Sequence, residues 1–510
     1  MFSLVLHSHL PWLANHGRWP VGEEWLYQSW ADCYLPLTAM LEQLAEDGHT
    51  DVLSLGITPV LAAQLDDPHC LSGMHHWLGN WQLRAHEATD RDLSVREHRG
   101  SAAALDRFEA RWRHGGSAVL RPLVDNRTVE LLGGPLAHPF QPLLDPRLRQ
   151  FSLSEGLLDA RSRWGTTPRG IWAPECGFTP GMETEYAAAG VSHFMVDGPA
   201  MRGDTSLGRP VWDSDVVAFG RDLPVSYRVW SPKSGYPGHG SYRDFHTYDH
   251  ATGLKPARVT GRSVASNDKA PYDPERAAAT VDRHVADFVD VVRRRLISES
   301  ERIGRDALVV AAFDTELFGH WWHEGPQWLG KLMRALPAAG ITVGTLGDAR
   351  EQGYVGAPLE LQDSSWGSGK DWRVWAGDDV ADLVALNAEV SRTALDAVDT
   401  ARAAQRRAGG PELRNRVNDQ ILRETLMAVA SDWAFMVSKD SAAGYARERA
   451  HVHAHALREI AAAAAGGSPV RANELARQWN RADGLFPALD ARRLPGTHVG
   501  GEREDAGGRR

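Results

Sequence analysis

Two carboxylates directly follow short apolar segments, in positions where side chains can do chemistry. Glu175 follows the segment Gly170–Trp172 and lies in a turn between Pro174 and Gly177. Asp314 ends the most apolar segment of the chain, ALVVAAFD. Removing such a carboxylate from water is costly unless it has a partner or a role. Two acids, one on each side of an anomeric carbon, are what cleavage or transfer of a glycosidic bond requires.

A structural role for the two acids is the alternative. Asp314 could cap the next helix, and Glu175 could pair with an arginine such as Arg169. Both acids lie close to tryptophans in the sequence. Two carboxylates at two strand ends with aromatic neighbours favour the catalytic interpretation.

Two histidines, His7 and His9, stand at alternate positions at the end of the first apolar segment. Side chains two residues apart on a strand face the same side, so the pair could bind a metal. With Asp314 or Glu316 they would form a catalytic zinc site with an open position, as in a metal-dependent carbohydrate deacetylase or amidohydrolase. The other interpretation, which we favour, is that these histidines hydrogen-bond substrate or the carboxylates.

Tryptophan is the unusual component of the composition, with 19 residues, whereas tyrosine and phenylalanine are not enriched. An indole face can stack on the C–H face of a sugar ring, and its N–H can reach a hydroxyl. A tryptophan-rich core is the plainer explanation for any single residue. Clusters in loop-like segments instead favour stacking platforms; they are Trp12, Trp19, Trp25 and Trp30, then Trp321 and Trp322, then Trp366, Trp372 and Trp375.

These residues need a scaffold that brings strand ends together. Short β-branched apolar runs alternate with helical stretches such as Ala102–Arg113 and Arg276–Arg295, which is typical of βα units around a parallel sheet. In barrels of this kind, chemistry gathers at the carboxyl ends of the strands. We therefore predict an α/β fold, a distorted (β/α)7 barrel, from seven strands at Phe2–Leu6, Val52–Leu55, Val129–Leu132, Gly170–Trp172, His193–Val196, Leu308–Phe313 and Ile341–Val343.

The pattern changes after the last of these strands. We predict a catalytic barrel over residues 1–350, a helical C-terminal domain over 351–495 and a disordered, Gly-rich tail over 496–510. The helical runs are expected at Asp379–Arg407, Glu412–Ser438, Ser441–Ala465 and Ala472–Arg481.

Charge and cysteine content exclude several classes of protein. Lys+Arg number 56 against 66 Asp+Glu, a formal net charge of -10, without a dominant basic block. A nucleic-acid partner is not expected, because such proteins gather positive charge against phosphates. The first residues, MFSLVLHSHLPW, carry no basic leader, so we expect no signal peptide and no membrane span. Three widely spaced cysteines fit a reducing, cytoplasmic location.

Five motifs together carry a family resemblance. They are HSHLP at His7–Pro11, GITP at Gly56–Pro59, WAPECGF at Trp172–Phe178, FDTELFGHWWHEG at Phe313–Gly325 and a SDWAFMVS segment at Ser431–Ser438. In this order, across nearly all of the sequence, they resemble the conserved regions of glycoside hydrolase family 57. The resemblance implies a (β/α)7 barrel with a helical C-terminal domain.

The same resemblance implies roles for individual residues. Glu175 would be the nucleophile and Asp314 the general acid/base, with the two carboxyl groups about 5–6 Å apart as in retaining enzymes. Asp314 would be protonated near neutral pH and Glu175 ionised. His7, His9, His138 and Asp432 would line the subsite of the cleaved sugar, and no metal or cofactor is implied. Four tryptophans match positions of aromatic acceptor and donor subsites: Trp230, Trp366, Trp375 and Trp433.

Within the family, SSWG at Ser364–Gly367, WRVW at Trp372–Trp375 and VWSPKSGYPG at Val229–Gly238 resemble 1,4-α-glucan branching enzymes. The implied substrate is an α-1,4-glucan such as amylose or a glycogen-like polysaccharide. The segment Asp197–Trp212, which we expect to correspond to a tyrosine-tipped lid, is short and lacks tyrosine. A short lid would admit water, so an α-glucan hydrolase or 4-α-glucanotransferase of the same family is the alternative. A non-catalytic glucan-binding protein is the third hypothesis.

Overall fold

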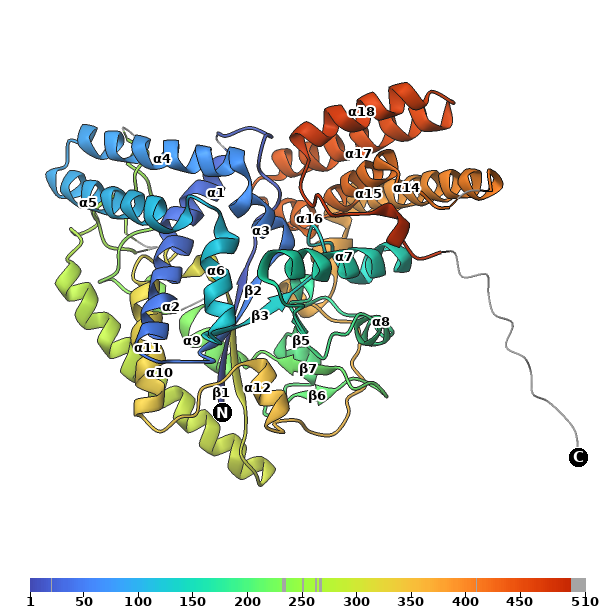
Figure 1. Ribbon diagram of the computed structural model, residues 1–510. Helices are drawn as coiled ribbons and strands as arrows, with labels where there is room; N and C mark the ends of the chain where they lie inside the picture. The colour runs from blue at the N-terminus through green and yellow to red at the C-terminus, as the bar shows by residue number, and fades with distance from the viewer. Residues whose placement is uncertain are drawn as a thin grey trace, which may run out of the picture.

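A mostly parallel sheet forms the centre of the computed structural model (Figure 1). The structure describes residues 1–19, 21–231, 235–249, 252–261, 264–265, 268–409 and 411–496. The strand order is β6-β7-β5-β4-β3-β2-β1-β8. The strands are β1 Phe2–Ser8, β2 Leu53–Ile57, β3 Val129–Gly133, β4 Gly170–Ile171, β5 His193–Val196, β6 Arg209–Pro210, β7 Val217–Gly220 and β8 Val309–Asp314.

Seven of these strands run parallel, and only β6 is antiparallel, against β7. The two ends of the parallel row are joined by single hydrogen bonds, in which the Asp222 N–H donates to the Val310 carbonyl at 2.8 Å and the Leu308 N–H to Ser206 at 2.8 Å. β8 is buried except at Asp314, as expected for a strand covered on both faces. The predicted distorted (β/α)7 barrel with a helical C-terminal region is confirmed.

One of the seven predicted strands is wrong. Ile341–Val343 forms only an isolated bridge, between Val343 and Phe2, because β2 pairs with β1 only from Val5 onward and leaves the start of β1 free on that side. The seventh parallel strand is instead β7, which pairs with β5 from His193↔Val217 to Val196↔Gly220.

Helices surround the sheet, and α10 illustrates how the sequence builds them. Asp273 caps its start by accepting from the Glu275 and Arg276 amides, and Gly304 ends it in the left-handed conformation. One face is buried, and from it Phe288 packs edge-to-face on Phe2 of β1, with ring centroids 6.0 Å apart. The helices up to residue 351 are α1 Glu23–Ser29, α2 Leu35–Glu46, α3 Pro59–Asp66, α4 Pro68–Glu87, α5 Arg91–Arg107, α6 Gly116–Asp125, α7 Pro146–Trp164, α8 Met182–Ala188, α9 Leu223–Val229, α10 Pro274–Ile303, α11 Gly325–Ala338 and α12 Leu346–Glu351.

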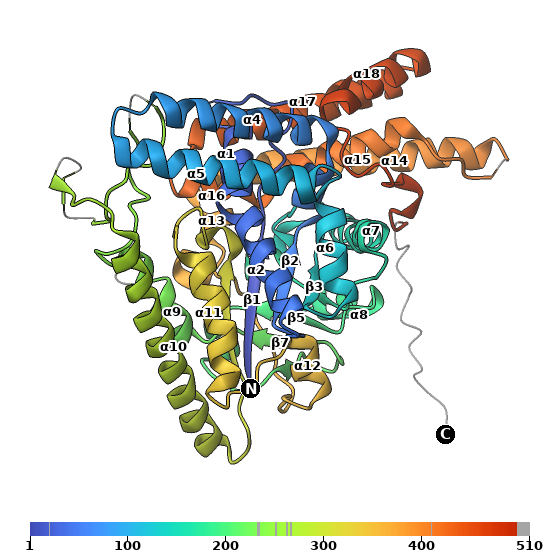
Figure 2. The ribbon, with the colours of Figure 1, turned by 60° about the vertical axis from the view of Figure 1, so that its left-hand side comes forward.

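Two helical groups cover the end of the sheet opposite to the N-terminus. The hairpin α4–α5 lies over one side of it, and the C-terminal helices lie over the other (Figures 1 and 2). The C-terminal helices are α13 Arg373–Ala376, α14 Ala381–Arg407, α15 Arg416–Ala428, α16 Ser431–Ser438, α17 Ala443–Ala465 and α18 Pro469–Ala482.

The predicted helix Glu412–Ser438 is interrupted. Helix α15 ends at Ala428 and α16 starts at Ser431, because Ala430 is extended and bridges to Pro139 while the Ser431 N–H donates to the His138 carbonyl at 3.0 Å. The interruption places the first turn of α16 at the carboxyl ends of the barrel strands. Within the described part of the chain, no helix combines the length and apolar character needed to cross a membrane. The predicted tail over 496–510 lies, except for Gly496, outside the described residues.

Candidate active site

Glu175 sits on a strained turn that follows β4. Its φ is 60° and that of Cys176 is 51°, so two consecutive non-glycine residues occupy the left-handed region. Each such residue costs about 1 kcal/mol or more and persists only where the surroundings enforce it. Here the Trp366 N–H donates to the Glu175 carbonyl at 2.9 Å and fixes the turn. The turn directs the carboxylate into the protein, where Glu175 is only 8% exposed.

Two side chains donate hydrogen bonds to the Glu175 carboxylate. The Ser431 hydroxyl donates to Oε1 at 2.7 Å, and the Trp366 indole Nε1–H donates to Oε2 at 2.8 Å. Burial raises the pKa of Glu175 to about 7, and the two hydrogen bonds act in the opposite direction by stabilising the carboxylate. Each oxygen therefore has one donor in place of water.

A row of neutral groups extends from Ser431 to His7. The Ser431 hydroxyl lies 2.9 Å from His138 Nδ1, and His138 Nε2 lies 3.2 Å from His7 Nε2. Burial lowers the pKa values of both histidines well below the usual range, so both are neutral. Because Ser431 gives its proton to Glu175, we assign the His138 proton to Nδ1 and the His7 proton to Nε2. His7 is held flat against Trp172, with ring centroids 4.4 Å apart.

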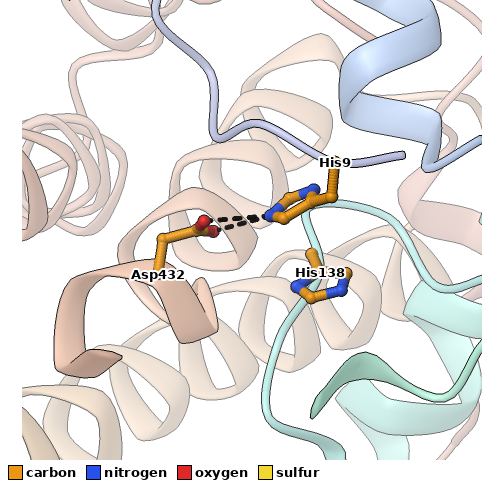
Figure 3. Close-up of side chains that lie close together, drawn as sticks. All are labelled: His9, His138 and Asp432. Carbon is orange, nitrogen blue, oxygen red and sulfur yellow. Dashed lines mark hydrogen bonds and ion pairs between the residues drawn. The ribbon is translucent and has the colours of Figure 1, made fainter. Parts of the chain in front are cut away.

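His9 belongs to a charged pair. Its Nε2 lies 2.9 Å from Asp432 Oδ1, and its Nδ1 lies 3.0 Å from the Thr58 hydroxyl. Burial lowers the pKa of His9, but Asp432, with Glu175 and Glu316, outweighs it, so that the pKa is raised. Figure 3 shows the His9 ring lying over that of His138, with Asp432 reaching His9 from the start of α16.

The histidines also define where a metal could be held. Ligand atoms of His9, His138 and Asp432 all lie within 4.8 Å of one another, and so do those of a second group, His16, His453 and Asp483. The first group shares only His9 with the zinc set considered from the sequence. The hydrogen bonds of His9 and His138 account for their positions without an ion.

Asp314 closes β8, where it pairs in register with His7 of β1. Its side chain is exposed on the open side. Protein atoms crowd the remaining sides, and this restricted hydration raises the pKa of Asp314 to about 6, against the effects of Arg221 and His9. Burial, with the Asp314 charge next, raises the pKa of the neighbouring Glu316 to about 7, although Tyr34 donates a hydrogen bond to it.

The order of the two pKa values differs from our expectation. Glu175 has the higher value, about 7, and Asp314 the lower, about 6. Much of this difference is already present in the free side chains, because the ordinary pKa of glutamate is higher than that of aspartate. Burial raises the pKa of both acids, and Arg221 opposes the rise at Asp314.

The predicted aromatic residues divide into two groups. Trp230 is 43% exposed, and Trp366 is half-buried between the Glu175 carboxylate and the Arg221 guanidinium, which lies 5.3 Å from its ring centroid. Trp375 and Trp433 are buried, 3% and 2% exposed. Trp375 stacks on Phe140 at 4.5 Å, and the Trp433 indole donates to the Met427 carbonyl at 2.8 Å. The structure places these two behind the site, not on a surface where a sugar could stack.

The segment Asp197–Trp212 does not lie over the site. Gly208 bridges to Val355 and Val211 to Leu359, and Arg209–Pro210 forms β6 along the first residues of β7. Most of the segment thus runs back to the amino-terminal side of the sheet. Part of the VWSPKSGYPG motif, residues 232–234, lies outside the described residues.

Two contributors were not predicted from the sequence. Ser431 stands immediately before Asp432 in a recognised motif, and its position at the start of a helix was the available signal. Arg221 follows β7, a strand that was itself missed, so no signal pointed to it.

Comparisons with known proteins agree with this geometry. A sequence model of glycosyl hydrolase family 57 matches residues 3–354, and a model described as 1,4-alpha-glucan branching enzyme, C-terminal, matches residues 389–493. The chain is 67% identical, over 97% of its length and 98% of the relative, to a probable 1,4-alpha-glucan branching enzyme of Mycobacterium tuberculosis. It superposes on a family 57 branching enzyme of Thermococcus kodakaraensis, solved with glucose and additives, with a TM-score of 0.88 and 28% identity over 96% of this chain and 95% of that one. A branching enzyme of Pyrococcus horikoshii gives a TM-score of 0.89 and 26% identity over 98% and 97% of the two chains.

Proposed function

The chain belongs to glycosyl hydrolase family 57, and we propose that it is a retaining 1,4-α-glucan branching enzyme with Glu175 as nucleophile and Asp314 as acid/base. It cuts an α-1,4 bond, holds the released segment on Glu175 and passes it to a 6-hydroxyl. The observation that carries the assignment is the enclosed Glu175 carboxylate, which receives hydrogen bonds from Ser431 and Trp366.

Cleavage uses both acids at once. Asp314 donates its proton to the oxygen of the breaking glycosidic bond, and that oxygen leaves as a 4-hydroxyl. A Glu175 oxygen forms a bond to the anomeric carbon from the opposite side. The Ser431 and Trp366 donors hold the carboxylate in place for this attack, which makes orientation part of the rate enhancement.

The proton reaches Asp314 when substrate is bound. In the free protein Glu175 has the higher pKa, about 7 against about 6. A glucan lying on the open side of Asp314 removes its remaining water and raises its pKa, because desolvation favours the neutral acid. Glu175 is already enclosed and gains less from the same substrate. Substrate binding therefore moves the pair toward the protonation that catalysis needs.

Transfer reverses the proton movement. Asp314, now ionised, takes the proton from the 6-hydroxyl of an acceptor glucose unit, whose oxygen bonds to the anomeric carbon as the Glu175 ester breaks. Water in the acceptor position gives hydrolysis instead. Each of the two displacements inverts the configuration at the anomeric carbon. The new linkage therefore has the α configuration, as the broken one had.

The activity is tested with amylose. The purified protein is incubated with amylose and the product is digested with a debranching enzyme. Short chains released by debranching are the expected result, and Glu175→Gln should give none. New reducing ends without debranchable linkages would refute branching and leave hydrolysis.

The roles of the two acids are tested by azide rescue with α-maltosyl fluoride, which needs no acid for its leaving group. In Glu175→Gly, azide replaces the nucleophile and should give the β-glycosyl azide. In Asp314→Gly, azide attacks the Glu175 ester and should give the α-glycosyl azide. Glu316→Ala is the matched control, because Glu316 has a similarly raised pKa, about 7, and should give neither product. An α-azide from Glu175→Gly would contradict the assignment.

A further inference from the structure

A cavity of about 230 Å³ lies beside the site, under the hairpin α4–α5. Its lining comes from four parts of the chain: α4 and α5, the end of α1 with the helical turn at Trp30–Tyr34, loop residues within 243–249 and 253–255, and the loop at 319–323. No role in the mechanism above has been given to any side chain in this lining. Trp81, Arg84 and Tyr248 carry the argument that follows.

The cavity is on the Asp314 side of the site. Gly319 and His320 in its wall follow Asp314 within six residues of the chain. Trp321, the next residue, has a side chain that is 46% exposed, and its backbone N–H donates to the Glu316 carbonyl at 3.2 Å. The Trp321 ring meets the edge of Phe245, another lining residue, with centroids 6.3 Å apart. This contact between an exposed and a buried ring connects the loop after Asp314 to the wall of the cavity.

The lining has the chemistry of a sugar site. Trp77 and Trp81, one helical turn apart on α4, lie with centroids 5.5 Å apart, and Tyr248 is 45% exposed. The Trp81 indole N–H donates to Glu97 Oε2 at 2.9 Å, which fixes the ring. Opposite it, α5 carries Gly100, where a Cβ would come within 3.6 Å of the Trp81 ring. The glycine lets α5 lie close to one part of the ring, and the half-buried indole still lines the cavity, where its flat face suits stacking by a pyranose.

The charges of the lining are almost balanced. Arg243 pairs with Glu97 at 2.7 Å, and Lys269, from outside the lining, pairs with Asp244 at 2.7 Å. Arg84 and Arg96 differ: they lie 5.3 Å from the Trp77 ring centroid and 4.7 Å from the Tyr272 ring centroid, and neither has a hydrogen bond or ion pair with the residues that the structure describes. A neutral ligand with many hydroxyls fits such a wall, since hydroxyls accept from an unpaired guanidinium without bringing a charge.

We propose that this cavity binds the acceptor α-1,4-glucan chain, with Trp81 stacking on a sugar ring and Arg84 donating to its hydroxyls. The inference rests on the proposed branching activity. The acceptor must approach from the acid/base side, because Asp314 takes its proton. The cavity and Trp321 lie on that side, whereas Glu175 comes from β4. Binding there raises the local concentration of acceptor over water and so favours transfer.

The experiment separates acceptor binding from donor cleavage. Isotope-labelled α-maltosyl fluoride loads Glu175 and releases one fluoride ion per glycosyl-enzyme formed. Maltoheptaose is added as acceptor, and labelled transfer product is counted per fluoride released. This ratio is normalised to the loaded enzyme, so it does not depend on how fast loading occurs.

Trp81→Ala should raise the maltoheptaose concentration that gives half-maximal transfer about tenfold, the loss expected for one stacking contact of about 1.4 kcal/mol. Arg84→Met keeps the aliphatic stem and removes the hydrogen-bond donors. It should also raise the maltoheptaose concentration that gives half-maximal transfer. Trp479→Ala is the matched control, since Trp479 is also a half-buried helical tryptophan whose indole donates to a glutamate, Glu459, at 3.2 Å. It should behave as the wild type.

The outcomes are distinct for the two levels of the proposal. If the wild-type protein releases no fluoride, the proposed function fails. If it releases fluoride and transfers, while Trp81→Ala and Arg84→Met both transfer as the wild type does, the acceptor site is refuted and the proposed function stands. If Trp81→Ala does not fold, Arg84→Met decides.

Discussion

The hydroxyl of Ser431 should set the pH at which the nucleophile becomes ionised. It donates to Glu175 Oε1 at 2.7 Å from a position that is 2% exposed, so water does not replace it freely. In Ser431→Ala the carboxylate loses one of its two donors and keeps Trp366. The neutral acid loses less, because the donor stabilises mainly the charged form.

The size of the effect follows from the energy of that bond. A hydrogen bond to a charged group contributes about 1.5 kcal/mol, and about 1.4 kcal/mol corresponds to one pKa unit. The pKa of Glu175 should therefore rise by about one unit from its value of about 7. The ionised fraction falls about tenfold near pH 5, about fivefold near pH 7 and hardly at all near pH 9.

The assay is kcat/KM for α-maltosyl fluoride as a function of pH, expressed as the ratio of variant to wild type. The protonation of Asp314 cancels in this ratio, so its pH dependence reports Glu175 alone. Ser438→Ala is the matched control, because Ser438 lies at the other end of α16 and donates to the Val374 carbonyl at 2.6 Å. A ratio for Ser431→Ala that is reduced by the same factor at every pH would refute the reasoning and leave Ser431 a packing role.

Three further predictions concern the acid/base, the core and the C-terminal helices. The basic limb of kcat should lie at higher pH than that of kcat/KM, because bound glucan raises the pKa of Asp314 above its free value of about 6; coincident limbs in the two profiles would contradict this. Phe288→Ala should lower the free energy of unfolding, measured in urea, by about 3–5 kcal/mol, since Phe288 is fully buried between β1 and α11. Ile297 is exposed on the same helix, so Ile297→Ala should change this free energy by about 0.5 kcal/mol or less. Equal losses in the two variants would contradict the packing argument. Burial lowers the pKa of His453 to about 3. Its contribution to stability is therefore present above about pH 6.5 and is lost as pH falls toward 3, at about 1.4 kcal/mol per pH unit. His453→Gln should make the acid limb of a urea-stability profile shallower, and an unchanged slope would show that His453 is not the source of that limb.

Much of the barrel could be predicted because its strands are covered on both faces. The run VVAAF before Asp314 has no polar residue, and such runs are diagnostic of buried parallel strands. β7 escaped prediction because it has only four residues, VAFG, in a polar context. Ile341–Val343 had the composition of a strand, but only one of its residues has a partner on β1.

The site was predicted less evenly. Glu175, Asp314, His7, His9, His138 and Asp432 were named from motifs, and the structure brings them to the carboxyl ends of the strands. The break between α15 and α16 was not predictable, because helix-forming residues continue through Val429 and Ala430 and only contacts with Pro139 and His138 interrupt them. Sequence also does not show which tryptophan faces outward: Trp321 is 46% exposed and its neighbour Trp322 is 1%.

The position of β1 has a consequence during synthesis of the chain. β1 is made first and lies between β2 and β8, and Ser8 meets Thr315 across 307 residues. At a synthesis rate of about 5–20 residues per second, the edge of β1 that pairs with β8 stays unpaired for about 15–60 s. The hydrogen bond between His9 and Asp432 forms later still, since Asp432 lies 423 residues after His9. A nascent chain that has both carboxylates but has not reached Ser431 and Asp432 cannot hold Glu175 as the finished protein does. The Glu175 carboxylate of such a chain therefore lacks its Ser431 donor until α16 has been made.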